Sequence, residues 1–259
     1  MLGKPFRVGK ILGIDLTISW SFLVLVAFFT MYTVFRSGEL LIGLISGIVS
    51  IALLAASVLA HELGHAIVAR RLGVKIAEIE LHLFGGAAKM LSLPRRPRDE
   101  IVIAGAGPMV SLALAALFGA PLLLGINPLG LFGPLALLNV MLGAFNLIPA
   151  LPTDGGRIFR AALSPKYGHL KATQIAVKVA RVATIGLAIW SVASGNFFAL
   201  GVVVFLWILG TQELRMAEAM TRRGSWEGAA RVAPETDGSR VEVYDRDGRF
   251  IGTAPGGAQ

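Results

Sequence analysis

The motif His61-Glu62-Leu63-Gly64-His65 lies inside a long apolar segment of this 259-residue chain. On a helix, His61 and His65 are four positions apart, so both imidazoles project from one face and can share one cation. Glu62 then lies beside the metal without having to bind it, which suits a general base acting on metal-bound water. The motif therefore predicts a hydrolytic zinc site with Glu62 as its catalytic residue.

A second segment, residues 146–157, offers the protein ligand that two imidazoles leave missing from a catalytic zinc site. Its sequence is N-L-I-P-A-L-P-T-D-G-G-R, in which the prolines break a helix and the glycines permit tight turns. Asp154 is the only carboxylate of this stretch, and we expect it on the same side of the membrane as His61. We therefore expect Asp154 to be the third ligand; the alternative is an aspartate that caps the next helix.

The composition is that of a membrane protein. Apolar residues make up 55% of the chain and charged residues only 15%, with a mean hydropathy of +0.71. Soluble domains have about 25% charged residues, so this chain has too few to cover a water-exposed surface. The absence of cysteine excludes disulfides and thiolate metal ligands. We expect one main integral membrane domain.

Six apolar runs are candidates for helices that cross the bilayer, which takes about 20 residues. They are residues 16–35, 41–69, 101–124, 129–148, 175–193 and 197–209. The fold class expected is thus an all-α polytopic membrane protein with six transmembrane helices. Residues 1–213 would form this domain, and residues 214–259 a short polar cytoplasmic tail.

The net charge of +8 follows this topology. With six spans and the N-terminus inside, only Arg36 of the 24 basic residues falls outside. Such a bias predicts cytoplasmic termini in a multi-pass protein, which we place in the plasma membrane. The charges lie between apolar runs, which argues against a nucleic-acid partner. One cluster is expected to fix orientation and contact anionic lipid headgroups; it comprises Lys89, Arg95, Arg96 and Arg98.

Two polar segments show strand patterns. Residues 77–84 alternate between polar and apolar side chains and end at Gly85-Gly86, which indicates a strand with a turn or a close backbone approach at its end. This β-strand or hairpin would lie on the cytoplasmic side after the second span. Residues 241–253 in the tail predict a hairpin that turns at Asp247-Gly248.

The pair H-E-L-G-H and N-L-I-P-A-L-P-T-D-G-G resembles the site-2 protease family of intramembrane zinc metalloproteases. That family combines H-E-x-x-H on one span with N-x-x-P-x-x-x-x-D-G on a later span. The Gly85-Gly86 loop and the stretch Ala104-Gly105-Ala106-Gly107-Pro108 agree with it, and the resemblance covers residues 1–213. The tail is similar to one hairpin of a CBS domain and is too short for a CBS pair, so we interpret it as a remnant.

The resemblance implies one Zn²⁺ per chain, bound by His61, His65 and Asp154, with Glu62 activating water. It also implies that Asn146 holds or polarises the substrate backbone. Its activity would be hydrolysis of peptide bonds within or next to transmembrane segments of other proteins, as in regulated intramembrane proteolysis. Thr153 stands where the family usually has Leu or Met, which concerns local packing around Asp154.

A substrate helix must unwind before cleavage, and the strand ending at Gly85-Gly86 could pair with the unwound segment. The remaining histidines, His82 and His169, are expected outside the site. Three alternatives differ in the use of the same residues. They are a metal transporter with His61, His65 and Asp154 as a transit site, a prenyl-protein protease with a glutamate as third ligand, and an inactive homologue. The oligomeric state stays open.

Overall fold

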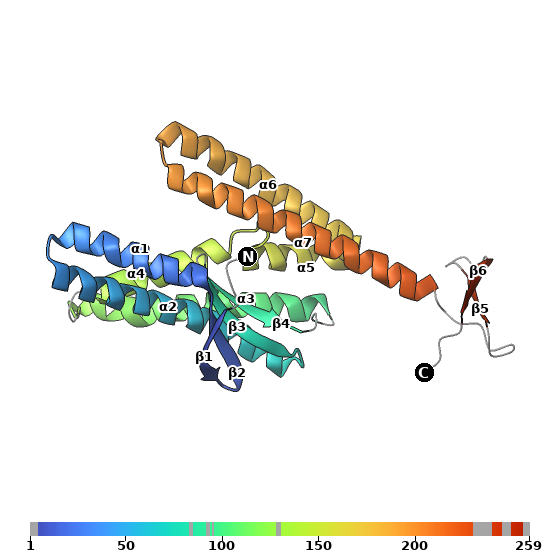
Figure 1. The fold of residues 1–259 in the computed structure, drawn as a ribbon, viewed down its shortest axis with the longest axis horizontal. Helices are drawn as coiled ribbons and strands as arrows, with labels where there is room; N and C mark the ends of the chain where they lie inside the picture. The colour runs from blue at the N-terminus through green and yellow to red at the C-terminus, as the bar shows by residue number, and fades with distance from the viewer. Residues whose placement is uncertain are drawn as a thin grey trace.

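A computed structural model describes residues 5–82, 85–91, 94, 96–127, 131–229, 240–244 and 250–255. The chain is mostly helical with a small β-sheet (Figure 1). Its α-helices are α1 (Trp20–Ser37), α2 (Leu40–Arg71), α3 (Pro97–Gly119), α4 (Phe132–Asn146), α5 (Asp154–Tyr167), α6 (His169–Ser194) and α7 (Phe197–Ala229). A 3-10 helix, η1 (Ala120–Leu124), continues α3.

Among the described residues, five helices are long and apolar enough to cross a membrane. They are α1, α2, α3 together with η1, α6, and residues 199–221 of α7. The fourth predicted span forms the shorter α4, which is 15 residues long. It ends at Asn146 because the chain leaves the helical path before Pro149 and Pro152. The protein is thus a multi-pass membrane protein, while the count of six spans stays a prediction.

The sheet corrects the prediction for the N-terminus. Its strands are β1 (Phe6–Ile11), β2 (Ile14–Ile18), β3 (Ile76–His82) and β4 (Gly85–Met90), in the order β1-β2-β3-β4. Only the β2–β3 pair is parallel. The first span was expected from Leu16, yet residues 14–18 alternate apolar and polar side chains and pair as a strand, so α1 begins at Trp20. The expected all-α class therefore omitted most of this sheet.

The strand predicted at residues 77–84 is confirmed over Ile76–His82, whereas Leu83 and Phe84 lie outside the described residues. Gly85-Gly86 opens β4, which returns antiparallel along β3. Because β3 lies between β2 and β4, its backbone is already paired on both sides. The expectation that β3 itself pairs with a substrate is therefore wrong, and the free edge of the sheet on this side belongs to β4.

The sheet packs against α2 through small apolar clusters. One contains Phe22, Ile51, Val58 and Leu81, which join α1, α2 and β3. Large apolar side chains elsewhere on α1 and α2 are exposed, as expected for helices that face lipid, while small and polar residues are buried. The sheet thereby fixes the position of β4 beside α2.

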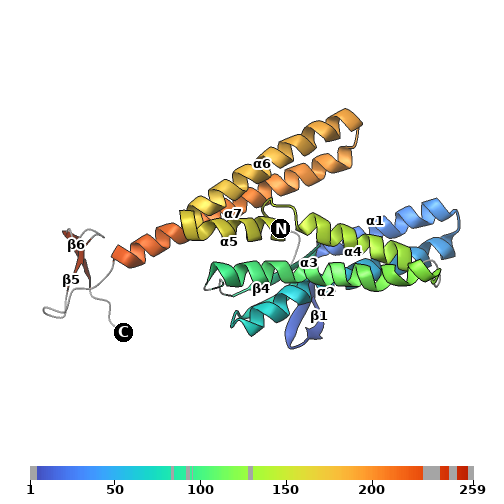
Figure 2. The same cartoon turned by 180° about the vertical axis from the view of Figure 1, so that it is seen from behind.

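Helices α6 and α7 form a hairpin with α5 beside it. Figures 1 and 2 show α6 and α7 side by side from both directions, and α5 packs against α6. A separate cluster of Leu151, Ala176 and Val177 joins the segment before α5 to α6. The hairpin thus reaches the rest of the protein mainly through α5 and the segment that precedes it.

The C-terminal tail contains β5 (Arg240–Tyr244) paired antiparallel with β6 (Phe250–Pro255). This confirms the predicted hairpin, although its expected turn at Asp247-Gly248 lies outside the described residues. Helix α7 runs without interruption through residue 213. The division into domains 1–213 and 214–259 stays a prediction.

Candidate metal centre

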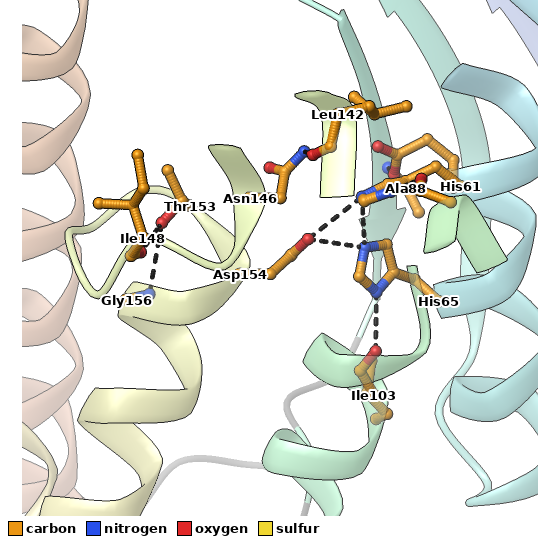
Figure 3. Close-up of polar contacts among 12 residues, drawn as sticks. His61, His65, Ala88, Ile103, Leu142, Asn146, Ile148, Thr153, Asp154 and Gly156 are labelled. Atoms are coloured by element: carbon orange, nitrogen blue, oxygen red, sulfur yellow. Dashed lines mark hydrogen bonds and ion pairs between the residues drawn. The ribbon is translucent and has the colours of Figure 1, made fainter. Parts of the chain in front are cut away.

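Helix α2 and the first residue of α5 bring together the three predicted ligands. The Nε2 atoms of His61 and His65 are 3.2 Å apart, and each lies 3.1 Å from Oδ2 of Asp154 (Figure 3). All three side chains are buried. The i, i+4 spacing on α2 therefore places both imidazoles against a carboxylate that is 89 residues further along the chain.

The outer nitrogens of both imidazoles have partners on α3. Nδ1 of His65 donates to the carbonyl oxygen of Ile103 at 2.7 Å, and Nδ1 of His61 lies 2.9 Å from Oγ of Ser111. Because a carbonyl can only accept, the proton of neutral His65 is on Nδ1, and its Nε2 directs a lone pair at Asp154. A lone pair facing a carboxylate oxygen at 3.1 Å is unfavourable by itself, and a metal cation between the two atoms would remove the repulsion.

The three inner atoms have the spacing of a zinc site. Bonds of about 2.0–2.1 Å to a tetrahedral Zn²⁺ separate neighbouring ligand atoms by about 3.3 Å, close to the 3.1, 3.1 and 3.2 Å seen here. Two imidazoles and one carboxylate also leave a fourth position for water, as in catalytic zinc sites. Zinc is the cofactor that this donor set fits.

Close packing of α3 holds the imidazoles in place. A Cβ on Gly107 would lie 2.2 Å from Nε2 of His65 and 2.7 Å from Nε2 of His61, so α3 passes directly over the metal ligands. A Cβ on Gly64 of α2 would lie 2.9 Å from the carbonyl oxygen of Ala106. The glycines at these two positions let α2 and α3 approach closely enough for Ser111 and Ile103 to reach the imidazoles.

Glu62 lies in the same cavity and is oriented by β4. Its Oε2 accepts a hydrogen bond from the backbone N–H of Ala88 at 3.1 Å. A Cβ on Gly86 would lie 2.5 Å from Cγ of Glu62, so the strand passes directly against this side chain. Glu62 is thus held beside the metal ligands by the backbone of β4.

Asp154 is positioned by the non-helical segment at residues 147–153 and by the cap of α5. Thr153 is the N-cap residue, whose Oγ1 accepts a hydrogen bond from the N–H of Gly156 at 3.4 Å. Capping, the alternative considered for Asp154, is therefore performed by Thr153, and a threonine before a helix start is a signal for this. Cβ atoms on Gly155 and Gly156 would lie 2.2 Å and 2.3 Å from backbone atoms of Leu147 and Leu151.

A cavity of about 340 Å³ opens beside the metal ligands and Glu62. Asn146 lines it from the end of α4, with its Nδ2 donating to the carbonyl oxygen of Leu142 at 2.9 Å. Gly86 also lines the cavity, but Gly85 is not among the described residues that do. Apolar side chains of α7 complete the wall; they are Phe205, Leu206 and Leu209.

Two residues, His82 and Lys89, have surroundings that differ from those expected from the sequence. His82 was expected outside the site, yet it lines this cavity, and burial lowers its pKa although Glu80 and Glu62 raise it. Lys89 was expected at lipid headgroups but forms ion pairs with Glu78 and Glu80, both at 2.7 Å. These hydrogen bonds, to Glu78 first, raise the pKa of Lys89. The alternation of polar and apolar residues along β3 predicts which face of the strand carries His82, but it does not predict which face meets the cavity.

The fold and the site define a helical membrane protein in which a buried His-His-Asp group that could bind a metal ion lies beside the carboxylate of Glu62. The chain belongs to peptidase family M50, the family of site-2 proteases, whose model matches residues 49–129 and 124–189. This confirms the resemblance inferred from the two motifs.

Named relatives agree with this family. A zinc metalloprotease of Methanocaldococcus jannaschii is 37% identical over 227 residues, which cover 85% of this chain and 63% of that relative's length. Rip3 of Mycobacterium tuberculosis is 34% identical over 294 residues, which cover 95% of this chain and 72% of the length of Rip3. The solved structure of a site-2 protease from Methanocaldococcus jannaschii matches with a TM-score of 0.64 and 37% identity, over 82% of this chain and 95% of that one.

Proposed function

We propose that this protein is an intramembrane zinc endopeptidase that hydrolyses peptide bonds within or next to transmembrane segments of other membrane proteins. The observation that carries the proposal is the buried group of His61, His65 and Asp154 with Glu62 beside it in one cavity. Because apolar side chains of α7 form one wall of that cavity, it suits an apolar peptide segment. The names of the relatives support the same chemistry.

Each residue has a definite task in this mechanism. When bound, zinc polarises the scissile carbonyl and lowers the pKa of a bound water. Glu62 accepts the proton of that water on a carboxylate oxygen and later gives it to the leaving amine. The N–H of Ala88 holds one oxygen of Glu62 at 3.1 Å, which leaves the other free to accept the proton. Ser111 and Ile103 keep the imidazoles in the orientation that ligates metal.

The edge of β4 is the part of this site that we assign to the unwound substrate. The N–H of Ala88 points toward Glu62, so by alternation the backbone groups of Gly86 face the same side, away from β3. A substrate backbone lying along this edge would receive the hydrogen bonds it loses on unwinding. Asn146, which lines the same cavity, still has its amide oxygen to receive a substrate N–H.

The finer topology belongs to the same proposal. We infer six spans with α4 as the fourth, both termini in the cytoplasm and residence in the plasma membrane, on the strength of the basic residues between the apolar runs. A transporter that uses the same three ligands is not favoured, because an ion transit site gives Glu62 no role and the relatives are named metalloproteases.

The decisive experiment compares Glu62→Gln with the wild type, using purified protein, metal analysis and a synthetic transmembrane peptide. We expect near-normal zinc content and a fall in cleavage of at least about a hundredfold, a typical contribution of general acid–base catalysis. The matched control is Glu78→Gln, which removes a carboxylate on β3 that forms an ion pair with Lys89 and does not line the cavity. Wild-type turnover in Glu62→Gln would refute the mechanism, and full zinc content in Asp154→Ala would show that the third ligand is misassigned.

A further inference from the structure

Two arginines one turn apart on α5 have opposite surroundings. Arg160 is 6% exposed and is neutralised by Glu100 of α3 and by Glu213 of α7, the latter at 3.0 Å. It joins three helices and therefore has a clear role in the fold. Arg157 is only half-buried, and in the described part of the chain its guanidinium makes no hydrogen bond or ion pair. No contact in the described part of the fold gives Arg157 a comparable structural role.

Arg157 lies where two cavities meet. It lines the active-site cavity together with Glu62 and Asp154, and it also lines a second cavity of about 160 Å³. Pro152 is shared by both cavities as well. The second cavity runs toward the charged end of α7 and contains Arg160, His169 and Glu213. Glu213 is already paired with Arg160. Arg157 therefore has no acidic partner among the described residues that line the second cavity.

Arg157 lies on α5, which is not among the described helices long and apolar enough to cross a membrane, so its half-buried guanidinium is open to water or to a ligand of opposite charge. Its planar set of donors matches a carboxylate, which it can bind through two parallel hydrogen bonds. Arg157 follows Asp154 by three residues, about 4.5 Å of helix, and its side chain adds a few ångströms of reach. An extended peptide advances about 3.3 Å per residue, so the contact would fall two to four residues from the scissile bond.

We propose that Arg157 is a specificity-determining residue that binds an acidic side chain of the substrate, two to four residues from the cut and on the side that enters the second cavity. This inference rests on the proposed function. A side-chain carboxylate is the source we choose, because the new carboxyl terminus of a product forms at the metal ligands rather than one helical turn away.

The test uses zinc-loaded full-length protein in phosphatidylcholine vesicles and a set of transmembrane peptides. Each peptide carries a single Glu at one position near the cut and has a partner with Gln at that position. We expect one position at which Glu raises kcat/KM about tenfold over Gln, mainly through KM, as one charged hydrogen-bonded pair provides. Arg157→Gln should abolish this difference, and Arg157→Glu should prefer a peptide with Lys there.

The matched control is Lys166→Gln, which removes the same charge from the same helix outside both cavities. It should keep the preference for Glu. A separate readout is the binding of fluorescently labelled versions of these peptides to the Glu62→Gln variant. The peptide that carries Glu should bind about tenfold more tightly than its Gln partner, and the double variant that also carries Arg157→Gln should bind both equally. This readout needs no turnover, so it distinguishes failure of the inference from failure of the protease proposal.

Two results would overturn the inference. Equal cleavage and equal binding of all Glu and Gln peptides by the wild type would show that Arg157 reads no substrate charge. A loss in Arg157→Gln that is the same for every peptide, and that appears only in vesicles containing phosphatidylglycerol, would assign Arg157 to a lipid headgroup instead.

Discussion

The metal-bearing helices and the α6–α7 hairpin use glycine in opposite ways. At Gly64, Gly107 and Gly155, a Cβ would come within 2.9 Å of a neighbouring atom, which is a backbone atom at Gly64 and Gly155 and an imidazole nitrogen at Gly107. On the hairpin, Gly186 and Gly201 have nothing within 4 Å of such a Cβ. The first region is closely packed around the candidate metal ligands, whereas these two glycines of the hairpin are exposed.

This difference matches the tasks of the two regions. Metal ligands must be held within a fraction of an ångström, and their support comes from groups locked by packing. A wall that receives different peptide segments has no such requirement. Substitutions at the closely packed positions of the first region should therefore weaken metal binding, and substitutions on the hairpin should leave it unchanged.

The largest effect is expected from Gly107→Ala. The added Cβ would lie 2.2 Å from Nε2 of His65, well inside the normal distance between non-bonded atoms, so the imidazole would have to move. We predict loss of most of the zinc and a fall in cleavage of more than about a hundredfold, as after removal of a general base. Metal analysis and peptide cleavage measure both.

The control for this prediction lies on the same helix. Gly105→Ala places a methyl group where nothing lies within 4 Å and should retain zinc and activity. Equal zinc content in the two variants would mean that α3 does not press on the ligands.

Ser111→Ala should have the next largest effect. It removes the 2.9 Å partner of Nδ1 of His61 and leaves that imidazole free to turn. Loss of such an outer partner typically weakens metal affinity about 10- to 100-fold, which competition with a zinc chelator measures. Thr184→Val removes a buried hydroxyl from α6 and should leave zinc affinity unchanged.

Gly86→Ala should affect turnover more than metal. The added methyl would lie 2.5 Å from Cγ of Glu62 and displace the base, or β4, without touching a metal ligand. We predict full zinc content and a decrease in kcat of about tenfold, less than the hundredfold or more expected when the base is removed. A parallel loss of zinc would show that β4 supports the ligands and not only the base.

The smallest effect is expected on the hairpin. Gly201→Ala meets open space and replaces a poor helix former by a better one. Zinc content and cleavage should equal those of the wild type, and the thermal midpoint should be the same or slightly higher. A measurable loss of zinc would break the distinction between the two regions.

The sequence was sufficient to identify the candidate metal ligands because the chemistry of a zinc site demands few arrangements. His61 and His65 at i, i+4 and Asp154 after a broken helix identified the group that the structure brings together. The same logic located β3, which alternates clearly. The roles of Glu62, Asn146, Gly85 and Gly86 stay predictions, although all but Gly85 line the cavity.

Partners set by tertiary packing could not be predicted. Ser111 and Ile103 lie on an ordinary apolar helix, and nothing in their types indicates that they meet imidazoles. Likewise β2 was absorbed into the first apolar run, because Leu16 and Ile18 suit a membrane helix as well as a strand. The parallel pairing of β2 with β3 depends on two intervening helices whose ends only the fold defines.

That parallel pairing also has a consequence for the order of assembly during synthesis. Asp15 pairs with Glu78 across the intervening helices α1 and α2, so the sheet can close only after both helices have been synthesised. Chains emerge from the ribosome N-terminus first. His61 and His65 are therefore in place long before Asp154 is made, and a nascent chain carries an incomplete ligand set until α5 follows. Because Asp154 is synthesised last of the three, the metal site can be completed only when most of the membrane domain exists. Unfinished chains therefore lack a functional centre.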